Sequence, residues 1–101
     1  MKAIELILAE RGKQIAKGYT SEHDDTHNEG QLAMAAVNYA CTSRNRMYVR
    51  SLYPWDANEY FHPDKTGTID GRIKDLAKAG ALIVAEIERL NRLKENESVE
   101  A

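Results

Sequence analysis

The amino-acid sequence predicts an all-α fold, a small bundle of three main helices with a long, irregular, aromatic-rich connection. Apolar residues recur at helical steps near both ends of the chain, and an almost uninterrupted apolar segment lies between these two stretches. The connection holds proline and glycine breakers and has no sustained period. A chain of 101 residues has room for one domain, which we expect to span residues 1–101.

The first helix is expected over residues 2–17. One of its faces carries four residues at steps of four, three and four: Ile4, Leu8, Arg11 and Ile15. Gly18 stands where helices commonly end on a glycine. Gly12 lies inside the helix and costs about 1 kcal/mol against alanine, so we expect another segment to pack closely there.

A polar segment, residues 19–27, follows the first helix and contains no aliphatic side chain, so it faces solvent or forms a site. The second helix is expected from residue 29 to residue 42, with Thr26 or Asn28 as its N-cap. This helix is apolar on nearly all sides, which indicates the buried centre of the domain.

The connection, residues 43–71, is expected to fold into short turns of its own or to carry function. Residues 46–50 suit either a short strand or a helical turn. Five aromatic residues gather in the connection: Tyr48, Tyr53, Trp55, Tyr60 and Phe61. Residues 42–78 hold seven Lys/Arg against five Asp/Glu, whereas the flanking segments are acidic. Rings beside cations suit a nucleotide. Alternatively, Trp55 and Phe61 attach the connection to the bundle.

The last helix has the clearest pattern. Steps of three and four link its apolar residues: Ile73, Leu76, Gly80, Ile83, Ile87 and Leu90. Asp70 suits its N-cap, and residues 94–101 form a polar end that we expect to fray. Small residues allow another backbone to come close: Ala77, Ala79, Gly80 and Ala81.

Composition argues against several partners and compartments. A net charge of -2 gives no field that would favour duplex nucleic acid or an anionic membrane. The longest apolar run, residues 79–85, is too short for a membrane span, and Glu5 interrupts any signal-peptide core. The single cysteine, Cys41, fits a reducing compartment, so we expect a cytoplasmic protein.

The sequence holds little that would support metal binding or nucleophilic catalysis. His23 and His27 are four residues apart with acids between them, but no third ligand accompanies them, so we expect no metal. Cys41 is expected to lie in an apolar helix, an environment that does not activate a thiol. The last helix offers the acids Asp75, Glu86 and Glu88, but Glu86 and Glu88 are two residues apart and cannot share one face. We therefore expect no catalytic residues and no cofactor.

Several stretches together resemble a small protein family that is common in phages and prophages. They are residues 10–15, the run Gly18-Tyr19-Thr20-Ser21-Glu22-His23-Asp24-Asp25-Thr26-His27, residues 30–36 with Tyr39-Ala40, the run Tyr53-Pro54-Trp55-Asp56, and residues 72–92. The resemblance covers about two-thirds of the chain. It implies the N-terminal domain labelled dATP/dGTP diphosphohydrolase, near the MazG-like all-α pyrophosphatases. The Glu-Glu-x-x-Glu and Glu-x-x-Asp motifs with which those enzymes hold Mg²⁺ do not stand in this sequence, so no catalytic residue is carried over.

We interpret the chain as a phage-encoded protein of the host cytoplasm that sequesters a small nucleotide without hydrolysing it. A cyclic or modified immune-signalling nucleotide is the ligand expected from the phage context. The expected base-stacking residues are Tyr19 and Trp55, and the expected phosphate-binding residues are Lys65, Arg72 and Lys74. The expected hydrogen-bonding residues for ribose or base are His23, Asp24, Asp25 and His27.

Two alternatives from other classes remain. One is a Mg²⁺-dependent nucleoside triphosphate diphosphohydrolase with Asp24, Asp25, Asp75 and Glu86 as metal ligands. The other is a module that binds a host protein through the last helix. In addition, we expect a homo-oligomer, because the apolar second helix and the small-residue last helix need more cover than one short chain supplies.

Overall fold

The computed structural model describes the backbone of residues 1–100 and the side chains of residues 1–97. It confirms the all-α class, with no strand in the described residues. The elements in chain order are α1 (Ala3–Ala16), α2 (Ser21–Asp24), α3 (Gln31–Ala40), α4 (Ser43–Arg46), the 3-10 helix η1 (Arg50–Leu52), α5 (Ala57–Tyr60) and α6 (Ile69–Glu100). None of these helices is long and apolar enough to cross a bilayer.

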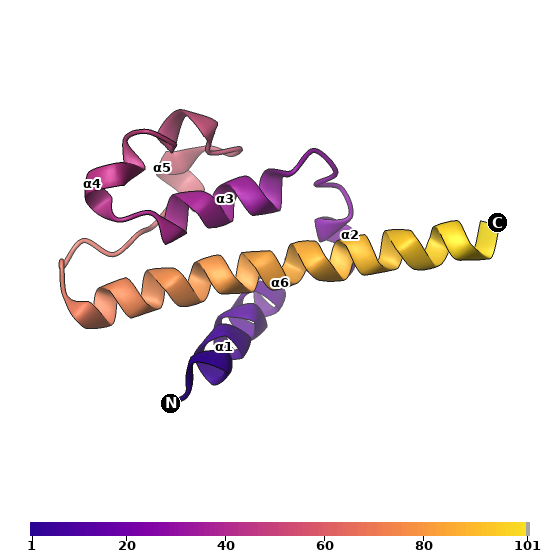
Figure 1. The fold of residues 1–101 in the computed structure, drawn as a ribbon, viewed down its shortest axis with the longest axis horizontal. Helices are drawn as coiled ribbons and strands as arrows, with labels where there is room; N and C mark the ends of the chain where they lie inside the picture. Colours follow the sequence, from indigo (N-terminus) through magenta and orange to yellow (C-terminus); the bar gives the residue numbers. More distant parts are fainter. Residues whose placement is uncertain (101) are drawn as a thin grey trace.

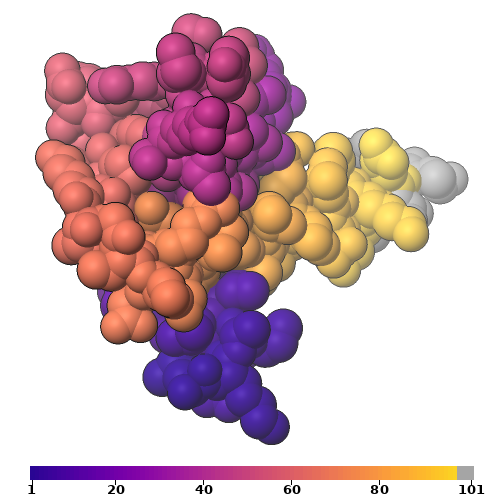
Figure 2. Space-filling model, turned by 60° about the vertical axis from the view of Figure 1, so that its left-hand side comes forward, coloured from indigo at the N-terminus to yellow at the C-terminus, as the bar shows by residue number. Residues whose placement is uncertain are grey.

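Helices α1, α2 and α3 all pack against the long helix α6 (Figure 1). Helix α3 lies along the N-terminal half of α6, with the α4–α5 segment beyond it, and α1 lies on the other side of α6. Helix α2 contacts α6 further toward its C-terminus. In the space-filling view α1 projects away from the rest of the molecule (Figure 2).

Small residues of α6 lie in the core. Ala77, Ala79, Ala81 and Ala85 are all buried, and Ala79 packs with Ala36 and Tyr39 of α3.

Gly80 makes the close approach between helices that the small residues predict. It lies so close to α1 that a Cβ there would come within 2.8 Å of the Ile7 side chain. Carbon atoms of neighbouring side chains pack at about 3.5–4.0 Å, so a Cβ at 2.8 Å would clash with Ile7. A glycine at this position therefore allows α1 to approach α6 closely.

Glycines shape the two turns that flank α2. Gly18 has a φ of 103° and follows the C-terminus of α1, as expected. The expected cap of the next helix is wrong, because Gly30, with a φ of 81°, is the N-cap of α3 and no side chain caps the helix. Thr26 cannot serve, because its hydroxyl donates to the His23 carbonyl and closes the end of α2.

Two other expectations are corrected, and a third stays a prediction. Helix α3 is shorter than residues 29–42, because the left-handed Gly30 begins it and extended backbone at Cys41 ends it. Helix α6 continues to Glu100 and Ala101 lies outside the described residues, so the fraying expected from residue 94 stays a prediction. Nothing lies within 4 Å of a Cβ at Gly12, so the close partner expected there is absent from the described residues.

The connection folds into α4, η1 and α5, as a long loop in a small domain was expected to do, and residues 46–50 form no strand. Polar contacts tie it to α3. The Asn38 amide donates to the Val49 carbonyl at 3.2 Å, and the Tyr39 hydroxyl accepts from the His62 backbone N–H at 3.1 Å. Arg46 donates to the carbonyls of Asn38 and Cys41, which satisfies the C-terminal end of α3.

Candidate functional site

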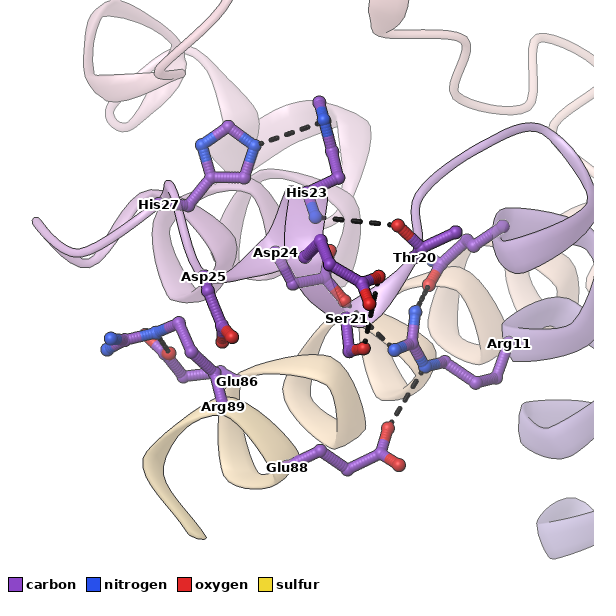
Figure 3. A network of polar contacts seen from close by, with 12 residues as sticks. Arg11, Thr20, Ser21, His23, Asp24, Asp25, His27, Glu86, Glu88 and Arg89 are labelled. Atoms are coloured by element: carbon purple, nitrogen blue, oxygen red, sulfur yellow. Dashed lines mark hydrogen bonds and ion pairs between the residues drawn. The ribbon is translucent and has the colours of Figure 1, made fainter. Parts of the chain in front are cut away.

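A buried ion pair holds α2 in place beneath the candidate site. Arg11 of α1 donates through Nη2 to Asp24 Oδ2 at 2.9 Å, and through Nε to Glu88 Oε1 of α6 at 3.1 Å (Figure 3). Arg11 is 7% exposed and Asp24 is 2% exposed. One guanidinium therefore connects α1, α2 and α6, and a carboxylate predicted to contact ligand instead has a structural partner.

A second pair fixes the other side of α2 to α6. Arg92 Nη2 donates to Asp25 Oδ1 at 2.8 Å and also to the Ser21 carbonyl. The hydrogen bond that Arg92 donates to the Asp25 carboxylate raises the pKa of Arg92. One turn earlier on α6, Arg89 Nε pairs with Glu86 Oε1 at 2.5 Å. Four carboxylates near α2 are thus paired with arginines: Asp24, Asp25, Glu86 and Glu88.

Four rings lie in a row across the surface above these pairs, and we call Tyr19, His23, His27 and Trp55 the ring row. Ring centroids are 5.4 Å apart between Tyr19 and His23, 5.0 Å between His23 and His27, and 4.9 Å between His27 and Trp55. His23 is exposed, and the other three side chains are half-buried. The ring row combines two segments far apart in sequence into one partly exposed aromatic surface.

The local sequence explains most of this arrangement. Tyr19, His23 and His27 follow one another at steps of four, so the single turn of α2 and its flanking turns place them on one side. The spacing of the histidines is visible in the sequence. Trp55 comes from the turn between η1 and α5, and only the tertiary fold places it on His27.

The two histidines share one hydrogen bond. Nε2 of His27 and Nε2 of His23 are 3.4 Å apart, so one of these nitrogens donates and the other accepts (Figure 3). Burial lowers the pKa of His27, and the positive charge that His23 can carry lowers it further, whereas Asp24 and Glu86 act in the opposite direction. The neutral form of His27 is therefore favoured.

The aromatic contacts continue from the ring row into the core. The centroids of Trp55 and Tyr53 are 5.8 Å apart, those of Tyr53 and Phe61 are 4.9 Å apart, and those of Phe61 and Tyr39 are 4.8 Å apart. Burial raises the pKa of Tyr53. Phe61 packs against the core around Ala79, so for Phe61 the alternative role, attaching the connection to the bundle, is the observed one.

The three cations predicted to bind phosphate lie away from the ring row. Arg72 donates to the carbonyls of Ala40 and Cys41, at the C-terminal end of α3. Lys74 is on the same first turns of α6, and Lys65 precedes that helix. Sixteen residues of α6 separate Arg72 from Glu88, which corresponds to roughly 24 Å along the helix axis. The structure thus brings Tyr19, His23, Asp24, Asp25, His27 and Trp55 together and places Lys65, Arg72 and Lys74 elsewhere.

A cleft between α4 and α5 contains Lys65 and two cations that the sequence did not indicate. Its volume is about 440 Å³, and its lining residues are Ser43, Arg46, Met47, Arg50, Ala57, Asn58, Phe61, His62, Pro63 and Lys65. No carboxylate is among these lining residues. The Arg46 guanidinium carbon lies 5.4 Å from the centroid of Phe61. Phe61 therefore borders both the aromatic contacts and a cationic cleft.

The four acids of the diphosphohydrolase alternative do not converge. Asp24, Asp25 and Glu86 are paired with Arg11, Arg92 and Arg89, respectively. Asp75 lies near the other end of α6, where it accepts from the Asp64 backbone N–H at 3.0 Å and lies 3.6 Å from Arg46. Within the part of the chain that the structure describes, no group of three or more His, Cys, Asp or Glu side chains is placed to hold a metal ion.

Comparisons of the chain with protein-family models, with curated proteins and with solved structures find no match.

Proposed function

We propose that the protein binds a small nucleotide and holds it without hydrolysing it. The observation that carries this proposal is the ring row, in which Tyr19, His23, His27 and Trp55 come from two separate segments and form one surface. Stacking of a base on such side chains contributes about 1–3 kcal/mol per base. The ion pairs of Arg11 and Arg92 hold this surface in place before any ligand arrives.

The cationic cleft is the phosphate-binding part of the proposal. Arg50 and Lys65 have no ion-pair partner within the described residues, whereas Arg72 is engaged by two backbone carbonyls. Two ring contacts lead from Trp55 through Tyr53 to Phe61, which lines the cleft. A nucleotide with more than one phosphate or base, such as a cyclic dinucleotide, has the length and the chemistry to contact both places.

The engaged carboxylates favour binding over hydrolysis. Hydrolysis of phosphate esters with Mg²⁺ needs free carboxylates that converge on the metal. Asp24, Asp25 and Glu86 each have an arginine partner, so recruiting them to a metal would first require three ion pairs to break. The phage context implied by the resemblance makes sequestration of a signalling nucleotide in the host cytoplasm the biological role that we propose.

A capture-and-release assay tests this function. The purified chain is mixed with nucleoside triphosphates and cyclic dinucleotides, with and without Mg²⁺, and the free pool is analysed before and after heat denaturation. Nucleotide that disappears and returns intact supports sequestration, and release of pyrophosphate overturns it. Trp55→Ala is expected to weaken capture by about 5- to 150-fold, which is the equivalent of one stacking contact. Tyr48→Ala is the matched control, because Tyr48 is 75% exposed and outside the ring row.

We also propose that the protein is a homo-oligomer, for a reason that differs from the one given by the sequence. Helix α3 is largely covered within the chain by α6 and by the connection, and the small residues of α6 are buried there too. Most of the exposed large aliphatic residues belong to α1 and α6. A host protein could also cover such a surface, so the self-association is tested separately below.

A further inference from the structure

An apolar face that no other described residue covers extends over α1 and α6. Its members are large aliphatic side chains that are 42–68% exposed: Ile4, Leu8 and Ile15 of α1, and Ile73, Leu76, Ile83, Ile87, Leu90 and Leu93 of α6. We call this set the α1–α6 face. Gly80 belongs to the same three-and-four pattern and faces Ile7 of α1, so α1 and this side of α6 lie next to each other.

Helix α6 is inverted relative to an ordinary surface helix. Its alanines are buried within the chain, whereas its isoleucines and most of its leucines are exposed; Leu82 is the exception and packs against the core. With Gly80 included, the residues of this stripe from Ile73 to Leu90 repeat at alternating steps of three and four, which is the heptad spacing of helices that pair with other helices. A monomer would normally bury such a stripe, because each large aliphatic side chain gains about 1.5–3 kcal/mol on full burial.

The accessible surface of the chain is larger than that expected for a folded monomer of its mass, as it would be if a second copy covered part of it. The accessible surface is 7065 Å², whereas a folded monomer of 11.4 kDa is expected to expose about 5,800 Å². The excess of roughly 1,300 Å² is more than the area, about 800 Å², that each partner loses in a standard interface. The radius of gyration, 14.4 Å, likewise exceeds the value of about 13 Å for a compact domain of this length.

Charge along α6 favours a copy of the same helix in the opposite direction. Residues 69–84 hold three Lys/Arg and two Asp, whereas residues 85–100 hold three Lys/Arg and five Glu. In an antiparallel pair the more positive half of each helix lies beside the more negative half of its partner, and in a parallel pair like halves meet. The exposed apolar stripe from Ile73 to Leu93 is centred on Ile83, so a two-fold axis near Ile83 matches both features.

We propose that the α1–α6 face is covered by a second copy of the chain, with the two α6 helices antiparallel about a two-fold axis near Ile83. Two helices from each copy then form a four-helix arrangement with a shared apolar interior. This inference rests on the self-association proposed above and is independent of the ligand, because the ring row is built from other residues.

The first test is the mass of the full chain by light scattering after size-exclusion chromatography. We expect about 23 kDa, twice the chain mass of 11.4 kDa, at micromolar concentration. Leu8→Glu and Ile87→Glu are expected to give a helical monomer, because these side chains face solvent within one chain. Leu52→Glu is the matched control: Leu52 is 53% exposed, close to the 58% of Leu8, but lies in η1, and this variant is expected to remain a dimer. A wild-type monomer overturns the proposal and leaves the face to a different protein.

The second test is the direction of the helices. In a Cys41→Ala background, Leu76→Cys and Leu90→Cys are made separately and treated with a short bismaleimide. Antiparallel helices centred on Ile83 place position 76 of one copy near position 90 of the other. We expect cross-linked dimers only after the two variants are mixed. Cross-linking of each variant with itself, or none in the mixture, overturns the antiparallel pairing. Nucleotide capture by the Leu8→Glu monomer reports separately on the ligand proposal.

Discussion

Arg11 and Asp24 form an almost completely buried ion pair, with Arg11 Nη2 2.9 Å from Asp24 Oδ2. The pair connects α1 to the single turn of α2, a segment too short to be stable as an isolated helix. Because α2 carries His23 and leads into His27, the position of the ring row depends on this contact. Tertiary ion pairs, more than helix propensity, therefore define the candidate site.

The first prediction concerns the cost of breaking this pair. Asp24→Ala leaves the Arg11 guanidinium buried without Asp24, and we expect the free energy of unfolding to fall by about 3–5 kcal/mol in urea titrations. The double variant Arg11→Met/Asp24→Leu is expected to lose less, because no buried charge remains unpaired. Lys13→Ala, which removes an exposed pair with Glu10, should change the value by less than about 1 kcal/mol. Equal losses in Asp24→Ala and Lys13→Ala would contradict the structural role.

The second prediction concerns pH. The pKa of His27 is lowered in the folded chain, mainly by burial, from an ordinary value of 6.5. As the pH falls through that ordinary value, the unfolded chain takes up a proton before the folded chain does, so stability decreases. We expect the Tm to fall between about pH 7 and about pH 5, and the fall to be smaller in His27→Phe, which keeps a ring between His23 and Trp55. His62→Gln is the control, and a smaller fall in that variant alone would refute the assignment to His27.

The third prediction compares two glycines in helices. Gly80→Val adds atoms where a Cβ already comes within 2.8 Å of Ile7, so overpacking should cost about 1–3 kcal/mol of unfolding free energy. Gly12→Ala meets nothing within 4 Å in the described residues and should gain up to about 1 kcal/mol from helix propensity. Thermal unfolding of the two variants measures both signs. A stabilised Gly80→Val would mean that α1 does not approach α6 closely at Gly80.

The helices could be predicted from the local sequence, whereas the contacts between them could not. The apolar spacing predicted the three main helices, and Gly18 predicted where α1 ends. The steps of three and four in α6 did not reveal that its large residues face outward, because periodicity shows that a helix has two sides but not which side its own chain covers.

For the candidate site, too, the local spacing could be predicted from the sequence, whereas the tertiary contacts could not. The four-residue spacing of His23 and His27 is a local property, and it correctly placed these two side chains together. The arginine partners of Asp24 and Asp25 come from positions 13 and 67 residues away, so no local pattern could assign them. Arg72 was expected to bind phosphate because it is a cation near a helix start, but it serves two carbonyls of α3 that only the folded chain brings near it.

The last prediction separates stability from binding at the two cations Arg72 and Lys65. Arg72→Ala removes the donors to the Ala40 and Cys41 carbonyls, each of which is worth about 1.5–3 kcal/mol when the donor is charged, so the variant should unfold more readily. Lys65→Ala removes an exposed cation of the cleft and should leave the Tm within about 2 °C while weakening nucleotide capture several-fold at low salt. Capture by Arg72→Ala, measured below its unfolding temperature, should match that of the wild type. If Arg72→Ala loses capture while Lys65→Ala retains it, phosphate binds near the start of α6 and the cleft is not part of the site.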